Sequence, residues 1–426
     1  QIKQRAAEAA GLCIDELTGD LAAALDSTDE QLDCLLAAAE RTFRCDNGSR
    51  LSTLGRMMVR EEIIAALRCR LQAAQYVSQH PDVLDTDMDQ FGPIVVLGLP
   101  RTGTTLLHLL LALDPRSRSF APWEMRSLVP PPEKDTYAQD ERITFYKSQM
   151  DNVRRLFPGV LDDIYSNHIH GDTYPEECIL LHANALHLFV AAMALRDGLY
   201  YDCINHSDGS RGELYDYHKF QAQLLLHKFK PEEGGFLVLK APSHSNFIDQ
   251  LARVYPKCRF VFTHRNPVAV APSVAKILHP INEMYLEAND LAAEGKMAQH
   301  VCEDYVRSMK KLREEVGLPV CSSIDVDEGK VSKADCQRAF DVHLDEMKTD
   351  ALSVVRRIYQ HYDLGPLLPE HVRRIQDVLQ NAAKLRVKAA PSSDGLQYHI
   401  PSTWSLDPAQ LATIFEEYND TLLQHF

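Results

Sequence analysis

The chain has 426 residues, of which 45% are hydrophobic and 25% charged, and its formal net charge is −15. This composition is ordinary for a globular protein with a large core, which can form one large domain or two. The acidic balance disfavours nucleic acid and anionic membrane surfaces as general partners. No apolar run is long enough to span a bilayer and no signal peptide is visible, so we expect no membrane span.

The first 90 residues are rich in Ala and Leu at helical spacing. They predict a helical N-terminal region (1–90) that packs on the core, and we expect a single α/β domain over 91–426 with a central, mostly parallel sheet. Apolar runs predict strands over 93–98, 236–240 and 259–263. Loops are predicted over 130–133, 200–212 and 395–406. Helices are predicted over 138–157, 175–195, 283–316, 349–362, 369–388 and 408–426.

Cysteine and histidine spacing indicates neither disulfides nor a metal. The ten cysteines contain no C-x-x-C pair, which favours reduced thiols and a cytoplasmic protein. His168 and His170 are close in sequence but lack further ligands nearby, so we predict no metal site.

The most informative stretch combines a strand, a loop and a helix. An apolar run rich in β-branched residues ends at Gly98, a turn containing Arg101 follows, and an apolar helical pattern runs through Leu113. A loop that leads into a helix N-terminus offers backbone N–H groups to phosphate or a similar anion. The spacing of Gly98 and Gly103 is that of a Walker A loop, but Thr104 replaces the Lys that binds β- and γ-phosphates. The loop therefore predicts an anion without a γ-phosphate, such as a phosphosulfate.

Three motifs resemble those of sulfotransferases that use 3′-phosphoadenosine 5′-phosphosulfate (PAPS). The loop over 98–105, with the sequence GLPRTGTT, resembles the family's 5′-phosphosulfate loop. Arg265 at a strand end, with Ser273 eight residues later, resembles the 3′-phosphate site. The stretch 240–244, with the sequence KAPSH, resembles the family's Lys-x-Pro-x-His strand end. The resemblance covers about 91–426, and the bacterial and tyrosylprotein-like branch fits best.

This resemblance implies a P-loop-like fold and transfer of a sulfuryl group from PAPS to a hydroxyl of a small molecule, without a metal. Arg101 is expected to stabilise charge on the bridging oxygen as the S–O bond breaks. Lys240 is expected to donate to that oxygen or to the sulfuryl group. The residues expected to bind the cofactor are Arg101, Thr102, Gly103, Thr104, Thr105, Arg265 and Ser273.

A base must remove the proton of the acceptor hydroxyl, and the sequence leaves several candidates. His244 lies just past a core strand end, near Lys240. Glu176 and Glu177 follow a proline at a predicted helix start, where acids are also ordinary helix-start residues. The tyrosylprotein-like branch uses a Glu as base, but we favour His244 because the glutamates have this simpler explanation. His168 and His170 are weaker alternatives.

Two other functions compete with the sulfotransferase interpretation. A P-loop nucleotide kinase or phosphotransferase should show Gly-Lys-Ser/Thr in the loop, and this Lys is absent. A non-catalytic nucleotide-binding protein of the same fold would not need Lys240, His244 or the acidic candidates, which are all present. The sequence identifies neither the acceptor nor the oligomeric state.

Overall fold

The centre of the protein is a parallel sheet. The computed structural model describes residues 1–26, 29–44, 50–167, 171–188, 198–322, 336–385 and 401–426. In these residues four strands pair in the order β2-β1-β3-β4, and every pairing is parallel. The strands are β1 (Ile94–Gly98), β2 (Val238–Lys240), β3 (Arg259–His264) and β4 (Ala339–His343). The predicted α/β fold with a central, mostly parallel sheet is therefore confirmed.

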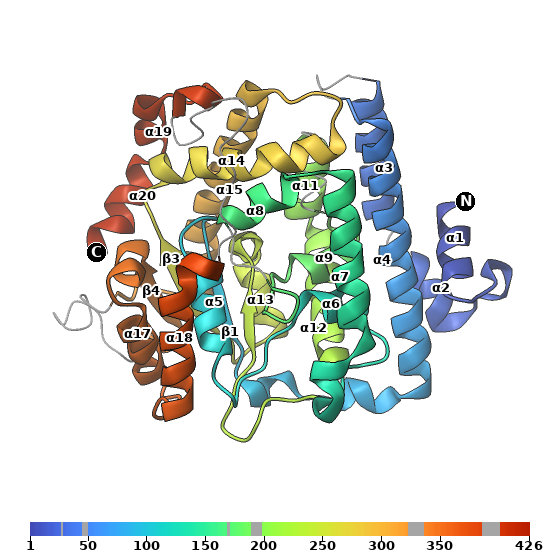
Figure 1. Ribbon diagram of the computed structural model, residues 1–426, viewed down its shortest axis with the longest axis horizontal. Coiled ribbons are helices and arrows are strands. Elements are labelled where there is room, and N and C mark those ends of the chain that lie inside the picture. Colours follow the sequence, from blue (N-terminus) through green and yellow to red (C-terminus); the bar gives the residue numbers. More distant parts are fainter. Residues whose placement is uncertain (27–28, 45–49, 168–170, 189–197, 323–335, 386–400) are drawn as a thin grey trace.

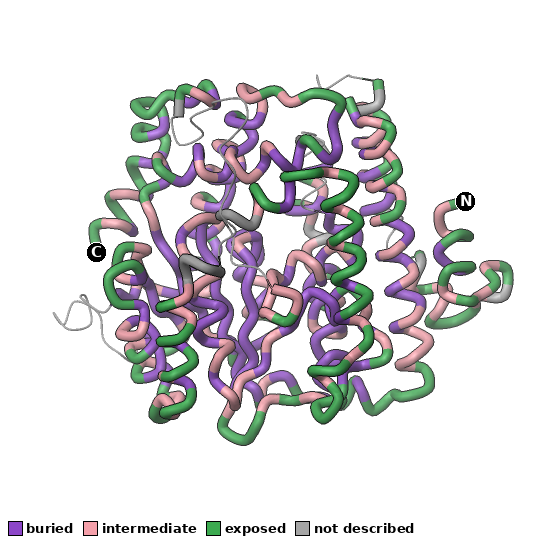
Figure 2. The backbone as a smooth tube through the Cα atoms, in the orientation of Figure 1, coloured by how far each residue is buried: buried purple, intermediate pink, exposed green. Residues whose placement is uncertain are grey.

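Both faces of the sheet are buried, as expected for a parallel sheet covered by helices. Alternate residues of β1 point to opposite faces, so Val95 and Leu97 belong to one hydrophobic cluster while Ile94 and Val96 belong to another. The first cluster also contains buried residues of α12, α13, α14 and α15, and the second contains buried residues of α5, α17 and α18. The strands accordingly run through the buried interior in Figure 2. The continuous apolar runs of the sequence arise from this two-sided burial.

The helices surround the sheet (Figure 1). The N-terminal helices are α1 (Ile2–Ala9), α2 (Gly19–Asp26), α3 (Asp29–Phe43) and α4 (Thr53–Gln79). The helices between β1 and β2 are α5 (Thr104–Ala112), α6 (Pro122–Arg126), α7 (Glu141–Leu156), α8 (Val160–Asn167), α9 (Ile179–Ala183), α11 (Gly198–His206) and α12 (Asp208–Leu226). The later helices are α13 (Ile248–Val254), α14 (Pro267–Tyr285), α15 (Leu291–Val316), α17 (Leu344–His361), α18 (Pro369–Leu385), α19 (Pro408–Ile414) and α20 (Glu416–Thr421).

The N-terminal region is helical, as its composition indicates. In Figure 1, α1 and α2 lie at the outer edge of the molecule, far from the strands, and α4 runs beside them. Leu67 and Leu71 of α4 share a hydrophobic cluster with Ile281 and Met284 of α14, which joins this region to the core. The proposed domain boundary near residue 90 stays a prediction.

Two predicted elements around the site are wrong. The predicted helix over 175–195 is only the short helix α9 in the described residues, and 189–197 lie outside them. The backbone N–H of Glu176 bonds to Phe120 O (3.0 Å) and that of Cys178 to Lys240 O (2.8 Å), so tertiary contacts hold this stretch outside a helix. The predicted surface loop over 200–212 is instead helical, because Tyr200 and Tyr201 are buried.

Other predicted helices differ mainly in their boundaries. The predicted helix over 283–316 is the end of α14 and the whole of α15, and the predicted terminal helix over 408–426 is broken near Phe415. The helix predicted from residue 349 begins earlier, at Leu344, where His343 accepts from the backbone N–H of Asp345. The residues 323–335 and 386–400 lie outside the described parts, including much of the predicted loop over 395–406.

The cysteines also correct the sequence analysis. Two disulfides join Cys34 to Cys203 and Cys321 to Cys336, so the prediction of scattered, reduced thiols is wrong for these four residues. Neither pair has a short, recognisable spacing, which is why the sequence did not reveal them. The cytoplasmic location that rested on this pattern stays a prediction. No helix in the described residues is long and apolar enough to cross a membrane.

Candidate active site

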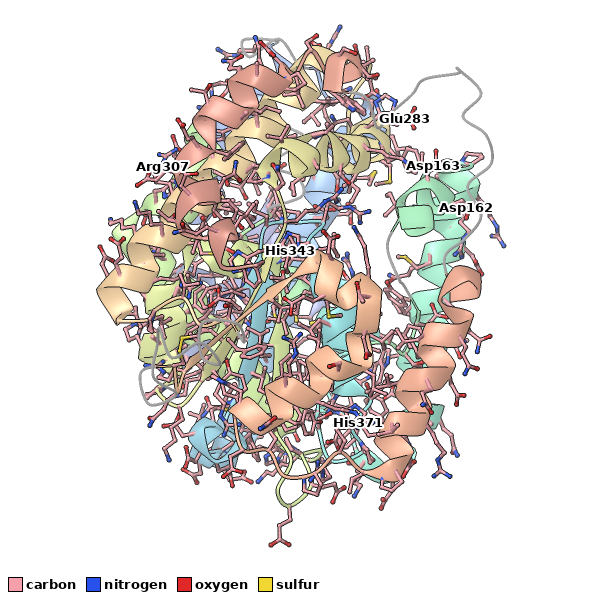
Figure 3. The ribbon with its side chains drawn as sticks, turned by 90° about the vertical axis from the view of Figure 1, so that its left-hand side faces the viewer. Asp162, Asp163, Glu283, Arg307, His343 and His371 are labelled. Carbon is pink, nitrogen blue, oxygen red and sulfur yellow. A yellow bond between two sulfur atoms is a disulfide. The ribbon has the colours of Figure 1, made fainter. Side chains whose placement is uncertain are left out.

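The three sequence motifs meet at the carboxyl edge of the sheet. β1, β2 and β3 end at Gly98, Lys240 and His264, and β1 lies between the other two. The chain adds β2 on one side of β1 and then β3 on the other side, so the strand order reverses at β1. Open α/β sheets bind ligands at such a topological switch point. Figure 3 shows His343 at the same edge, where β4 passes into α17.

The loop after β1 is fastened to β3. Gly98 has φ of 136°, and a Cβ at this position would lie 2.3 Å from the carbonyl oxygen of Thr263. Only glycine allows this approach of the two strands. The hydroxyl of Thr102 donates to Leu99 O (2.6 Å) and lies 2.5 Å from the hydroxyl of Thr263. The buried Thr102 side chain therefore holds the loop against β3. The part of Thr102 that remains available to a ligand is its backbone.

Arg101 connects two of the motifs. Its backbone is left-handed, with φ of 67°, an uncommon conformation for a residue other than glycine. Its Nε donates to Ser273 Oγ of α14 over 3.1 Å, and Nη1 of Arg265 donates to the Arg101 carbonyl oxygen over 3.2 Å. All three side chains are partly exposed. The loop that carries Arg101 is therefore in contact with both Arg265 and Ser273, so groups that commonly bind anions come from both motifs.

The loop ends at the N-terminus of α5. Gly103 precedes the helix with φ of 95°, and Thr104 and Thr105 are its first two residues. The first amides of a helix have no partner within it and carry partial positive charge, so they favour an anion. The hydroxyl of Thr105 accepts a 3.3 Å bond from the ammonium group of Lys240, which links this helix start to the end of β2.

Lys240 forms an ion pair with one of the predicted bases. Its Nζ donates to Glu177 Oε1 over 2.6 Å; the Lys240 side chain is fully buried, while that of Glu177 is 19% exposed. The backbones are also joined, because the N–H of Cys178 donates to Lys240 O. Glu177 is thereby held at the carboxyl edge of the sheet with a side that still faces solvent.

His244 lies in a different setting. It belongs to a 3₁₀ turn, Pro242–Asn246, and its side chain is fully buried. Its Nδ1 is 2.6 Å from the hydroxyl of Tyr215. Burial lowers the pKa of His244 well below its ordinary value, and the nearby His218 and Lys240 lower it further. The imidazole is therefore neutral, and its Nδ1 is bonded to the hydroxyl of the buried Tyr215.

Glu176 differs from its neighbour. Its Oε1 accepts the backbone N–H of Glu177 (2.9 Å), and its charge acts on the buried His108 of α5. The side chain thus helps to shape the turn that presents Glu177. His168 and His170 lie outside the described residues.

The sequence analysis missed a buried network beneath Arg265. The Asp341 carboxylate of β4 accepts from Nη1 of Arg313 (2.6 Å) and lies 2.7 Å from Nε2 of His264, whose Nδ1 is 2.8 Å from the hydroxyl of Tyr418. Burial alone would raise the pKa of Asp341, but the charge of Arg313 and the hydrogen bonds hold it well below its ordinary value. This network fixes the strand end that carries Arg265. Its members are too far apart in sequence to form a motif.

Comparison with known proteins identifies the chain at this point. The model of the sulfotransferase family matches residues 93–366, which is more than half of the chain. The chain belongs to the sulfotransferase family. It is therefore a transferase of sulfuryl groups, as the three motifs predicted, and this function is favoured over that of a nucleotide kinase.

Individual relatives agree with this assignment. Omega-hydroxy-beta-dihydromenaquinone-9 sulfotransferase Stf3 of Mycobacterium bovis is 25% identical over 343 residues, covering 74% of this chain and 78% of Stf3. The crystal structure of sulfotransferase STF9 from Mycobacterium avium superposes with a TM-score of 0.77 at 26% identity, covering 99% of this chain and 95% of that one. Sulfotransferase STF1 from Mycobacterium tuberculosis H37Rv shares the fold, with a TM-score of 0.72, 23% identity, and coverage of 98% and 97%. These bacterial neighbours match the P-loop-like fold implied by the loop over 98–105.

Proposed function

We propose that this sulfotransferase takes its sulfuryl group from PAPS and transfers it directly to a hydroxyl of a small-molecule acceptor. The observation that carries the proposal is the convergence of Arg101, Arg265 and Ser273 beside the glycine-containing loop. PAPS carries phosphate groups at two positions, and this site offers two separate kinds of anion binder. One is a helix start, and the other is a pair of arginines with a serine.

The residues at the site fit such a donor. The amides at the start of α5, with the hydroxyls of Thr104 and Thr105, would hold the 5′-phosphate. Arg265 and Ser273 would hold the 3′-phosphate, since a guanidinium fork matches a phosphate group better than an ammonium does. PAPS, when bound, supplies the sulfuryl group together with a phosphate leaving group.

Lys240 and Arg101 are proposed to stabilise the developing charge. Lys240 is buried and bonded to Thr105, so its ammonium group reaches the same helix start that would hold the 5′-phosphate. Fixed positive charge in a site shielded from water stabilises charge that develops during bond breaking. Arg101 is proposed to act from the opposite side of the loop.

Among the predicted bases, the geometry supports Glu177 more than His244, contrary to our preference from the sequence. Glu177 contacts Lys240 and is partly exposed, so an acceptor hydroxyl can reach it. His244 is fully buried and bonded through Nδ1 to Tyr215. The Glu177 carboxylate would accept the hydroxyl proton while the hydroxyl oxygen bonds to sulfur and the phosphate oxygen leaves with its electron pair.

An acceptor screen tests the proposal. The purified protein is incubated with sulfur-labelled PAPS and a panel of phenols, short alcohols and long apolar alcohols. The panel includes a hydroxylated menaquinone derivative, because the name of the relative Stf3 specifies such an acceptor. Label transfer to one class of hydroxyl is expected in the wild type and not in Lys240→Ala. No transfer to any member, by a protein that also fails to bind adenosine 3′,5′-bisphosphate, would overturn the proposal.

A further inference from the structure

A cluster of buried histidines lies beneath the Lys240–Glu177 pair. His182 belongs to α9, His218 to α12, and His244 to the turn after β2. The ring centre of His182 lies 5.4 Å from that of His244 and 5.6 Å from that of His218. The thiol of Cys178 completes the group: its Sγ and one ring nitrogen each of His218 and His244 all lie within 4.8 Å of one another.

Several ring nitrogens of these histidines have no hydrogen-bond partner among the residues that the structure describes. His218 and His244 each use Nδ1 for a tyrosine hydroxyl, that of Tyr255 at 2.8 Å and that of Tyr215 at 2.6 Å. Their Nε2 atoms have no hydrogen-bond partner among the described residues, and neither nitrogen of His182 has one. Unpartnered buried nitrogens are costly, and four of them in one place call for an explanation.

The arrangement has the features of a metal site. Histidine ligands usually have the second ring nitrogen held by another polar group, as the two tyrosines hold these. Neutral imidazole is the form that binds a metal, and burial lowers the pKa of His218 to about 3. Burial also raises the pKa of the Cys178 thiol to about 12, so a cation is needed to favour its thiolate.

We propose that Cys178, His218 and His244 bind one Zn²⁺ ion, with the thiolate and two imidazoles as three ligands of a tetrahedral site. His182, whose ring centre lies 5.4 Å from that of His244, would have to turn toward the ion to take the fourth position. Thiolate and imidazole together suit zinc, whose structural sites are four-coordinate. Bonds of about 2.0–2.3 Å place tetrahedral ligand atoms roughly 3.4–3.7 Å apart, so the side chains close on the ion by about 1 Å. Cys178 releases its thiol proton to solvent as the ion binds.

The ion would act as a structural support for the catalytic edge. Cys178 directly follows Glu177, and His244 follows Lys240 by four residues. The site thus ties together the two segments that carry the ion pair, and α12 through His218. This role is independent of the identity of the sulfuryl donor.

Metal content tests the inference directly. The full chain is produced with added Zn²⁺, freed of loose metal by gel filtration, and analysed for bound elements. About one zinc per chain is expected in the wild type, and near none in Cys178→Ser and His218→Gln. Cys302→Ser is the matched control, because Cys302 is also a buried free cysteine but lies outside the cluster. It should keep the zinc.

A second measurement uses the wild type alone, in case the variants do not fold. The chelator-treated protein is titrated with Co²⁺, which should produce the visible bands of a tetrahedral site and a sulfur-to-cobalt charge-transfer band. Chelation should also lower the melting temperature, and Zn²⁺ should restore it. The inference is overturned if the wild type takes up no zinc and shows no such band. Equal zinc in Cys178→Ser, His218→Gln and Cys302→Ser would overturn it as well.

Discussion

The ammonium group of Lys240 and the carboxylate of Glu177 form a 2.6 Å ion pair at the end of β2. A fully buried lysine needs a counter-charge, and Glu177 provides it from a position that solvent still reaches. The pair therefore joins a residue that can stabilise negative charge to one that can accept a proton. This arrangement explains how one strand end can serve both the donor and the acceptor.

Replacing Glu177 tests its role as base. Glu177→Gln should lower the turnover number by about 10²–10⁴-fold while donor affinity stays near that of the wild type. Glu176→Gln is the matched control and should retain most of the turnover, because its side chain supports the turn. A His244→Ala variant that folds and binds donor normally but loses turnover, while Glu177→Gln remains active, would return the role of base to His244.

Arg265→Ala should separate two donors. A charge-assisted contact to the 3′-phosphate contributes about 1.5–3 kcal/mol, so calorimetry should show PAPS affinity falling roughly 10- to 150-fold. The affinity for adenosine 5′-phosphosulfate, which has no 3′-phosphate, should change little. Arg253→Ala removes a surface arginine paired with Asp216 and serves as the control. An equal loss for both donors would show that Arg265 does not contact the 3′-phosphate.

Gly98→Ala should destabilise the protein. The new Cβ would meet Thr263 O at 2.3 Å, and φ of 136° is unfavourable for alanine. The backbone strain alone costs about 1–3 kcal/mol, so urea unfolding should show at least this loss. Gly212→Ala is the matched control, since a Cβ there meets nothing within 4 Å. If Gly98→Ala is as stable as Gly212→Ala, this result would contradict the close approach of β1 to β3 at Gly98.

The buried histidines predict acid sensitivity. His108 is bonded to Ser119, and burial lowers its pKa to about 3. Below about pH 6.5 the unfolded chain binds a proton that the folded protein does not. The stability that this neutral histidine contributes is therefore present above that pH and is lost as the pH falls, by about 1.4 kcal/mol per unit.

A substitution isolates this contribution. Urea unfolding is measured at several values between about pH 6.5 and about pH 5. Over this range the free energy of unfolding should fall less steeply with decreasing pH in His108→Gln than in the wild type, and the difference in slope should correspond to one proton. His80→Gln, at an exposed position, should leave the slope unchanged. An unchanged slope in His108→Gln would contradict the buried, neutral state of His108.

The sequence predicted the strands, and the turn between β1 and α5, because both depend on local patterns. The two-sided burial of β1 leaves a continuous apolar run, and the spacing of Gly98 and Gly103 follows from the loop geometry. The helix predicted from residue 175 failed for a tertiary reason. Phe120 and Lys240 bind the backbone there and outweigh the local helix-start signal.

Long-range arrangements were beyond the sequence. Cys178, His218 and His244 lie in separate segments, so their approach in space leaves no spacing motif in the sequence. The choice among the candidate bases also depends on long-range packing, since the exposure of Glu177 and the burial of His244 depend on the packing of α9 and α12. The disulfide between Cys34 and Cys203 joins residues 169 positions apart.

Binding of adenosine 3′,5′-bisphosphate tests the proposed donor site most directly, because this molecule is PAPS without its sulfuryl group and with both phosphate positions occupied. Calorimetry and thermal unfolding without Mg²⁺ should show saturable binding by the wild type and a rise in melting temperature with ligand concentration. Arg265→Ala should weaken both effects. Absence of binding at millimolar ligand, or stabilisation by ATP with Mg²⁺ only, would contradict a PAPS site built from the loop over 98–105, Arg265 and Ser273.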